Sequence, residues 1–282
     1  MKVLIAGCGD LGTETGLRLR RDGHEVVGLR RDPSRLPDKF DRLAGDLTGP
    51  LPPLPADTDA VVFAAAPGER SVAAYGRVYR DGLARVLEGL AEVGASPARV
   101  LFVSSTAVYG VDDGSLVDED TPTEPTSATG EVLVAAEDLL LATPVPGTTF
   151  RLGGVYGPGR TRLIDQVRGG VATIPDRPTH TNRIHRDDAA EAIVHLLTRV
   201  AEPATVYLGV DHDPAERAEV LRWLADQLGC PAPPVGVGDR RTRGGDKRCV
   251  NDRLVATGFR FAFPTFREGY TALLAGVGTR HP

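Results

Sequence analysis

Short apolar runs alternate with longer amphipathic segments along this chain. The runs are rich in β-branched residues and the segments repeat apolar residues every three or four positions, so the pattern predicts strands alternating with helices. Strands are predicted at 2–6, 24–31, 59–67, 98–110, 147–160 and 204–210. Helices are predicted at 13–23, 71–94, 127–142, 161–168, 187–200, 214–229 and 264–275. The stretches 33–50 and 236–248 are predicted to be loops, the second of them mobile.

This alternation over residues 1–155 predicts an α/β fold, in which helices cover both faces of a doubly wound parallel sheet of the Rossmann type. We expect a nucleotide-binding domain at 1–158. A smaller C-terminal substrate-binding part at 159–282 would be interleaved with the sheet. In such sheets the ligand lies beyond the C-terminal ends of the strands. The segments expected to meet in one crevice are 7–12, 64–67, 104–109 and 151–158.

A glycine motif follows the first predicted strand. Gly7, Gly9 and Gly12 have GxGxxG spacing, with Asp10 and Leu11 between the last two, and a second strand-like run follows about twenty residues on. The first glycine permits a tight turn, the second lets the backbone approach a pyrophosphate, and the third lets helix pack closely on strand. The helix N-terminus then favours the anion, so the motif predicts a dinucleotide site.

The end of the second predicted strand indicates which nucleotide binds. An acidic residue there holds the ribose 2′-hydroxyl of NAD, whereas an arginine accommodates the 2′-phosphate of NADP. This chain has Arg30 and Arg31 at that position. Because the guanidinium fork binds phosphate oxygens in pairs, NADP is favoured over NAD. The alternative is a solvated basic loop that includes Arg35.

Composition narrows the class of protein further. The 282 residues are 41% hydrophobic and 25% charged, which is typical of a globular protein. The net charge of −5 argues against a general nucleic-acid binder, and no apolar run approaches the ~20 residues that span a bilayer. The chain runs directly into its first strand without a leader, so we expect a cytoplasmic location. Three cysteines at unpatterned spacing predict neither disulfides nor zinc, and His180 and His185 lack a third ligand.

Several motifs together resemble the short-chain dehydrogenase/reductase superfamily, in the extended branch that includes NAD-dependent epimerases and dehydratases. The resemblance covers nearly the whole chain, from GCGDLG through VSSTAVYG, VAAEDLLL and RLGGVYGPGR to NRIHRDDAAEAI. It implies that Asp46 and Leu47 contact the adenine and that Ser105 occupies the catalytic serine position. The small residues that would line the cofactor are Ala64, Ala65 and Ala66.

The chain departs from this family at its catalytic residues. Active members carry YxxxK, in which the tyrosine transfers a proton and the lysine lowers its pKa. Here these positions are Thr129 and Leu133, which cannot replace a phenol and an ammonium group. Gly154 replaces an expected asparagine. Thr106 and Ala107 stand where dehydratases carry Asp–Glu, which argues against sugar-nucleotide dehydration.

Two readings follow from this pattern, which is similar to the atypical extended subgroup. The chain is either an NADP(H)-dependent oxidoreductase or epimerase that acts on a hydroxyl or carbonyl compound, or a non-catalytic NADP(H)-binding sensor. Non-redox isomerisation or elimination on the same scaffold is a third alternative. The groups predicted to take over proton transfer or to contact substrate are Ser105, Tyr109, Asp81, Tyr79, Tyr156, Arg183 and His185.

Five of these groups also have a structural interpretation. Ser105 would cap a turn, Tyr109 would pack its ring, and Asp81 would pair with Arg77 or Arg85 on its own helix. Arg183 would bind a carboxylate or phosphate and His185 would titrate near neutral pH, unless both pair with Asp187 or Asp188. Family members often dimerise through the helices at 71–94 and 127–142, so the resemblance leaves a homodimer open, and the sequence does not settle the oligomeric state. The sequence does not identify the small-molecule substrate.

Overall fold

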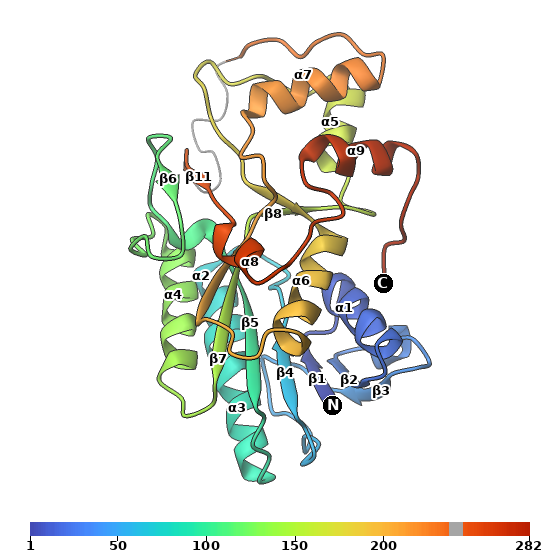
Figure 1. Ribbon diagram of the computed structural model, residues 1–282, viewed down its shortest axis with the longest axis vertical. Helices are drawn as coiled ribbons and strands as arrows, with labels where there is room; N and C mark the ends of the chain where they lie inside the picture. The colour runs from blue at the N-terminus through green and yellow to red at the C-terminus, as the bar shows by residue number, and fades with distance from the viewer. Residues whose placement is uncertain (237–244) are drawn as a thin grey trace.

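A computed structural model describes residues 1–236 and 245–282 of the chain. Its centre is a sheet of seven parallel strands in the order β10-β7-β5-β4-β1-β2-β3 (Figure 1). Six of these strands are largely buried, as expected from their continuous apolar runs. The strands are β1 (Lys2–Ala6), β2 (Glu25–Arg30), β3 (Asp41–Ala44), β4 (Ala60–Phe63), β5 (Arg99–Ser105), β7 (Gly147–Leu152) and β10 (Val206–Gly209).

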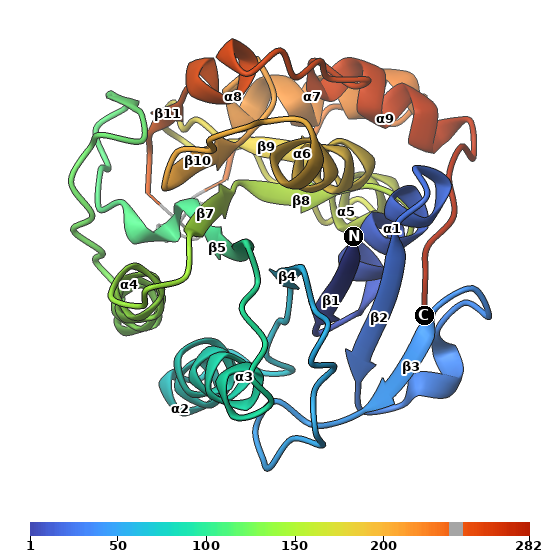
Figure 2. The ribbon, with the colours of Figure 1, turned by 60° about the horizontal axis from the view of Figure 1, so that its bottom comes forward.

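Helices cover both faces of this sheet, as the sequence predicts (Figure 2). One face packs against α1 (Asp10–Arg21) and α6 (Arg186–Thr198), which also contact each other. The other face packs against α3 (Asp81–Glu92) and α4 (Ala128–Leu141). The doubly wound Rossmann fold is therefore confirmed, and the C-terminal ends of its strands share one edge.

The predicted strands 98–110 and 147–160 differ in extent, because the first ends at Ser105 and the second is interrupted at Gly153. Two further sequence predictions differ more. The stretch 33–50, predicted to be a loop, contains a 3₁₀ turn at Pro33–Arg35 and the edge strand β3. Strand β3 is mostly exposed, so its short polar sequence carries no apolar run that would reveal it. The helix predicted at 71–94 is divided into α2 (Val72–Tyr75), a π-helical segment Gly76–Arg80, and α3.

The C-terminal part has a core of its own above the strand ends (Figure 1). Its helices are α5 (Arg162–Arg168), α7 (Arg217–Gln227) and α9 (Phe266–Leu274), and a short α8 (Asp252–Ala256) lies beside β10. Strand β8 (Gly154–Tyr156) pairs with β9 (Arg183–His185), and β6 (Leu116–Val117) pairs with β11 (Arg248–Cys249). Helix α6 and strand β10 return from this part to the main sheet, so the two parts of the chain interleave.

Most of the predicted loop 236–248 lies outside the described residues, which resume at Gly245. Its described end is tightly held, because Lys247 is buried and Arg248–Cys249 forms β11. In the described ranges, no helix combines the length and the apolar character needed to cross a bilayer.

Candidate dinucleotide and substrate site

The glycine loop between β1 and α1 has the geometry that a dinucleotide requires. Gly7 has φ +79°, and a Cβ there would lie 2.5 Å from the Cα of Ala65 at the end of β4. A Cβ on Gly12 would lie 3.0 Å from the Ile5 side chain, so helix and strand are in close contact. A Cβ on Gly9 would meet only the carbonyl of Gly7, at 3.9 Å, so its outer side is open to a ligand.

The first turn of α1 is free to bind an anion. Its N-cap is Gly9, which offers no side-chain acceptor to the first amide groups, and Leu11 turns its side chain into the core. Unpaired amides and the helix dipole attract a pyrophosphate at this point. The chain's own residues therefore fit a dinucleotide here: the loop supplies close approach and the helix supplies donors.

Asp10, the fourth residue of the motif, would repel phosphate if its carboxylate faced the ligand alone. It is instead neutralised by two arginines from distant segments. Arg186 Nη1 lies 2.8 Å from its Oδ1, and Arg160 Nε lies 2.9 Å from its Oδ2. Arg186 is 1% exposed and also pairs with Asp187 at 2.6 Å. Sequence reasoning missed Arg186, and the only signal was an arginine directly after the short strand β9, before two aspartates.

The last described residues lie across this same region. The amide of His281 donates to Asp10 Oδ1 at 3.1 Å, and its imidazole lies 2.7 Å from Glu14 Oε2. Burial raises the pKa of Glu14, but the hydrogen bond from His281 and the nearby Arg18 and Arg186 charges bring it down to about 2. We call residues 279–282 the tail segment. At its start the carbonyl of Thr279 accepts from Arg186, and at its end the carbonyl of Pro282 accepts from Arg30, the last residue of β2.

Arg30 is the last residue of β2, where the residue that selects NAD or NADP is expected. Its Nη1 donates to the carbonyls of Cys8, at 3.2 Å, and of Pro282, at 3.0 Å. Arg31 is exposed beside it. Asp46 accepts hydrogen bonds from the amide and hydroxyl of Thr48, which lower the pKa of its carboxyl.

The remaining predicted cofactor residues are Leu47 and the three alanines that follow β4. Leu47 is buried against the sheet and its carbonyl accepts from Arg85 at 2.9 Å. The small residues after β4 are partly exposed to solvent, and Ala65 among them lies against Gly7 of the glycine loop. These residues are Ala64, Ala65 and Ala66. The structure thus brings Asp46 and Leu47, the expected adenine contacts, to the same edge of the sheet as the glycine loop and the end of β4.

Ser105 ends β5, and its Oγ accepts from the amide of Ala107 at 3.2 Å. The nearby Tyr109 points into the core. Tyr109 is 2% exposed, and its hydroxyl accepts from Arg151 at 2.6 Å. Burial raises the pKa of Tyr109 to about 12. Arg151 in turn pairs with Glu137 at 2.6 Å. Tyr109 is therefore part of a buried polar network, and its hydroxyl faces Arg151.

The positions of the missing catalytic pair lie on α4. Thr129 is half-buried in the first turn, with its hydroxyl 3.4 Å from that of Ser127, and Leu133 is buried in the core. Tyr79 packs its ring edge-on against Phe102, and burial raises its pKa above the ordinary value. Asp81 pairs with the adjacent Arg80 at 2.8 Å, a partner that the sequence analysis did not consider.

The predicted substrate residues meet in the C-terminal part. Tyr156 packs against the ring of Tyr270, with centroids 4.6 Å apart, and its hydroxyl approaches the carbonyl of Thr265. Burial lowers the pKa of His185 to about 4, so the expectation that it titrates near neutral pH is wrong. Its Nδ1 instead accepts from the amide of Asp187. Arg183 also lacks the expected aspartate partner, because Asp187 pairs with Arg186 and Asp188 accepts from backbone amides.

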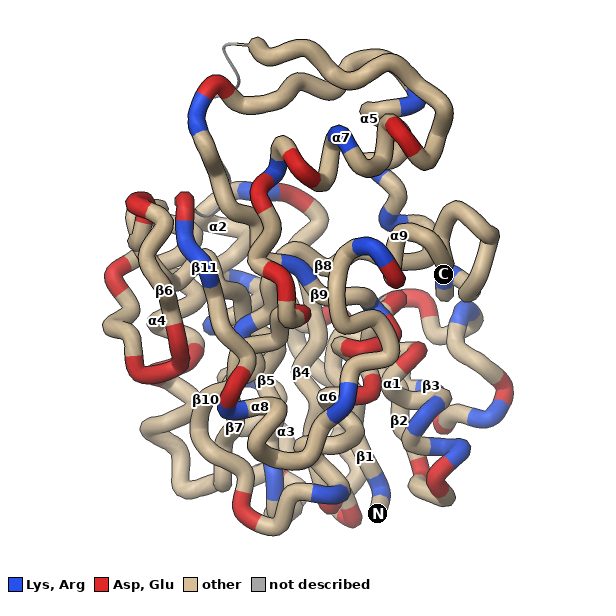
Figure 3. The backbone as a smooth tube through the Cα atoms, turned by 45° about the horizontal axis from the view of Figure 1, so that its top comes forward, with Lys and Arg blue, Asp and Glu red and all other residues tan. Residues whose placement is uncertain are grey.

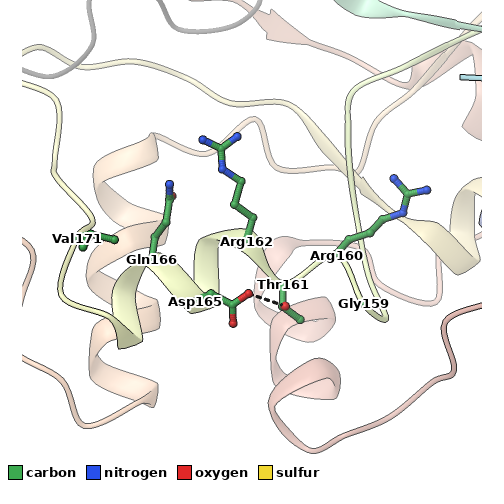
Figure 4. A pocket seen from close by; sticks show the side chains of 7 residues that line it. All are labelled: Gly159, Arg160, Thr161, Arg162, Asp165, Gln166 and Val171. Carbon is green, nitrogen blue, oxygen red and sulfur yellow. Dashed lines mark hydrogen bonds between the residues drawn. The ribbon is translucent and has the colours of Figure 1, made fainter. Parts of the chain in front are cut away.

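An open cavity of about 460 Å³ lies where the C-terminal part meets this crevice (Figure 4). Arg160, which binds Asp10, is on its wall, so the cavity adjoins the glycine loop. The side chains of Arg162 and Gln166 also reach into it from α5. The arrangement places this open cavity, with Arg160, Arg162 and Asp165 on its wall, beside the glycine loop.

Together the fold and the glycine loop define a Rossmann-type dinucleotide-binding protein of the extended short-chain dehydrogenase/reductase class. Residues 3–209 match the model of the NAD dependent epimerase/dehydratase family. The chain belongs to this family, which confirms the resemblance found in its motifs.

Comparison with individual proteins agrees with this assignment. The chain is 30% identical to a 3-diazoavenalumate denitrifying reductase from a Streptomyces species, over 95% of this chain and 99% of that one. It superimposes on an NAD-dependent epimerase/dehydratase-type structure from Methylobacillus flagellatus with a TM-score of 0.80 and 37% identity, covering 98% of both chains. A structure of MoeE5 with UDP-glucuronic acid and NAD gives a TM-score of 0.78 at 26% identity, over 96% of this chain and 97% of that one.

Proposed function

We propose that this protein is an NADP(H)-dependent oxidoreductase that transfers hydride between the nicotinamide and a small organic molecule. The observation that carries the proposal is the open glycine loop with Arg30 at the end of β2. Gly7, Gly9 and the free first turn of α1 would hold the pyrophosphate. Arg30 and the exposed Arg31 would hold the 2′-phosphate, because NADP differs from NAD by this group alone.

The chain's own residues limit which substrates it would reduce. The cofactor would supply a hydride, but Thr129 and Leu133 supply neither the phenol nor the ammonium that normally deliver the accompanying proton. Ser105, at the end of β5, stands where the family resemblance implies the catalytic serine, and it would donate a hydrogen bond to a substrate oxygen. The missing pair favours acceptors that take hydride without a proton from the protein.

The carbon of an aryl diazonium cation satisfies this requirement. Hydride addition followed by departure of N₂ consumes the two electrons of the hydride and needs no protein acid. The relative that is 30% identical over nearly its whole length is named as a denitrifying reductase of a diazo compound. This supports reduction of a similarly activated acceptor as the chemistry of the present chain, in preference to epimerisation of an unactivated alcohol.

Titration calorimetry of the full chain with NADPH and with NADH tests the cofactor. We expect tighter binding of NADPH, and a loss of at least about tenfold in Arg30→Ala, since a charge-assisted hydrogen bond contributes about 1.5–3 kcal/mol. Arg35→Ala, on the neighbouring 3₁₀ turn and paired with Asp32, is the matched control. Equal binding of the two nucleotides, or no binding, would contradict the proposal.

Turnover then separates an enzyme from a sensor. Absorbance measures NADPH consumption with an aryl diazonium salt and, for comparison, with a benzaldehyde. We expect faster consumption with the diazonium salt. Nucleotide binding without consumption of NADPH by any acceptor would indicate the sensor instead.

A further inference from the structure

The first two residues of the tail segment are firmly held. Arg186, which is 1% exposed, donates from Nη2 to the carbonyl of Thr279 at 2.8 Å. Arg280 Nη1 donates to the carbonyl of Gly159 at 2.8 Å, and the Arg280 side chain lies directly against Gly159, where a Cβ would clash with it. Gly159 belongs to the wall of the open cavity. The segment is therefore anchored at its start, between the first residue of α6 and the cavity wall.

The last two residues of the segment lack such an anchor. Pro282 is exposed and His281 is partly buried. The amide of His281 donates to Asp10 Oδ1 at 3.1 Å, and its Nε2 lies 2.7 Å from Glu14 Oε2. Neither residue buries an apolar side chain in the core, and segments with few such contacts open at low free energy. This end of the chain can therefore leave α1 without unpacking the fold.

The segment ends at the residue expected to select the nucleotide. Figure 2 shows the chain running from α9 past α1 to a point beside β2 and β3. There Arg30 Nη1 donates to the carbonyls of Cys8, at 3.2 Å, and of Pro282, at 3.0 Å. Figure 3 shows basic segments around β2 and β3 on this side of the molecule. Pro282 thus lies where the 2′-phosphate of NADP would lie.

A 2′-phosphate is a stronger acceptor for Arg30 than the carbonyl of Pro282. The carbonyl is neutral, whereas a phosphate monoester carries a charge of about −1.5 to −2 at pH 7. Contacts between arginine and phosphate pair opposite charges and are frequently bidentate, whereas the carbonyl accepts a single bond from Arg30. The 2′-hydroxyl of NAD carries no charge. The phosphate would therefore displace Pro282 from Arg30, and the hydroxyl would not.

We propose that His281 and Pro282 form a displaceable strap that competes with the 2′-phosphate of NADP(H) for Arg30. NADP(H) takes Arg30 from Pro282 and draws the adjoining His281 away from α1, while the first two residues of the tail segment stay anchored. NAD(H) leaves the strap in place. The strap lowers the preference for NADP(H) that Arg30 provides, because each NADP(H) molecule must first displace it. This inference rests on the proposed NADP(H) dependence and adds the residues that set its extent.

The amide of His281 reports the position of the strap. The chain has six histidines, so 15N-histidine labelling of the full chain gives six backbone amide signals, and His281→Gln identifies the one that belongs to His281. Saturating NADP⁺ should shift this signal, because the amide loses Asp10 as its acceptor. Saturating NAD⁺ should shift it much less. The signal of His24, which lies beyond the far end of α1, is the internal control.

Weakening the strap should favour NADP(H). His281→Ala removes the contact with Glu14, so we expect NADPH to bind about threefold more tightly, which is the equivalent of part of one hydrogen bond, and NADH affinity to stay within about twofold. His24→Ala is the matched control, because the His24 ring lies 3.4 Å from the amino group of Met1, at the opposite end of α1. This variant should bind both nucleotides as the wild type does.

An unmoved His281 signal at saturating NADP⁺, or an equal shift with NAD⁺, would overturn the strap and leave the proposed function intact. Unchanged NADPH affinity in His281→Ala would overturn it as well. Failure of NADP⁺ to bind the wild-type chain would contradict the proposed function, and the strap with it. Calorimetry on the labelled chain separates that outcome from the others, because it establishes saturation independently of the His281 signal.

Discussion

Arg186 and Asp10 form a buried hydrogen-bonded ion pair of 2.8 Å between residues that are 176 positions apart in the sequence. The pair joins the C-terminal end of β9 to the first turn of α1, and it removes the negative charge that Asp10 would otherwise present to a pyrophosphate. One contact thus serves both the packing of α6 against α1 and the electrostatics of the nucleotide site.

Removing Arg186 should therefore damage stability and nucleotide binding together. Arg186→Gln leaves the Asp10 carboxylate in the buried cluster without its main partner, and breaking such a pair costs about 3–5 kcal/mol. Chemical denaturation should report this loss in the free energy of unfolding. Arg199→Gln, whose pairs with Asp22 and Glu191 are half-exposed, should cost no more than about 1 kcal/mol. Similar losses in the two variants would contradict this role for Arg186.

Deleting the tail segment should change nucleotide preference. The carbonyl of Pro282 occupies Arg30, so removal of 279–282 frees this guanidinium for a 2′-phosphate. We expect NADPH to bind about threefold to tenfold more tightly, which is the equivalent of one hydrogen bond, while NADH affinity stays nearly constant. Calorimetry on the shortened chain measures both. Weaker binding of both nucleotides would show instead that the tail forms part of the binding surface.

Tyr109→Phe distinguishes an architectural from a catalytic role for this phenol. The variant leaves Arg151 Nη1 without its 2.6 Å acceptor in the core, so we expect a loss of about 1–3 kcal/mol in the free energy of unfolding. Because the pKa of Tyr109 is about 12, no limb of the pH–rate profile below pH 10 should belong to it. Tyr207→Phe, which removes a hydroxyl that accepts from the Ala204 amide, is the control and should cost less. Abolished NADPH oxidation in folded Tyr109→Phe would assign it to catalysis.

Asp211 should make stability depend on pH. Its pKa is about 8 in the folded protein and 3.8 in the unfolded chain, because burial favours the neutral carboxyl. Between these values the folded protein holds a proton that the unfolded chain has lost. The stability that Asp211 contributes is therefore fully present below pH 4 and is lost as pH rises through this window, by at most about 1.4 kcal/mol per pH unit.

Asp211→Asn should flatten that slope, since an amide keeps the acceptor for Asp213 and cannot ionise. Denaturation series at pH 5 and pH 8 measure the effect, with Asp213→Asn as the matched control. Parallel pH dependence in wild type and Asp211→Asn would exclude the linkage.

The sequence predicted those features that arise from local pattern. Continuous apolar runs identified the buried parallel strands, and the spacing of Gly7, Gly9 and Gly12 located the loop that the structure places beside Ala65. Strand β3 escaped detection because an exposed edge strand needs no apolar run. Arg186 and the tail segment escaped because their partners, Asp10 and Arg30, are distant in sequence. Titration of His185 was misjudged for the same reason, since its burial depends on Phe263 and Tyr156.

The contact between the tail segment and Asp10 also bears on the order in which the molecule forms. His281 meets Asp10 across 271 positions, so loop closure between these residues is among the entropically costly steps of folding. The sheet and the glycine turn can assemble from contacts of shorter range, whereas the contacts around Asp10 are completed only after His281 has been synthesised. During synthesis a nucleotide would therefore encounter the glycine loop before the tail reaches it.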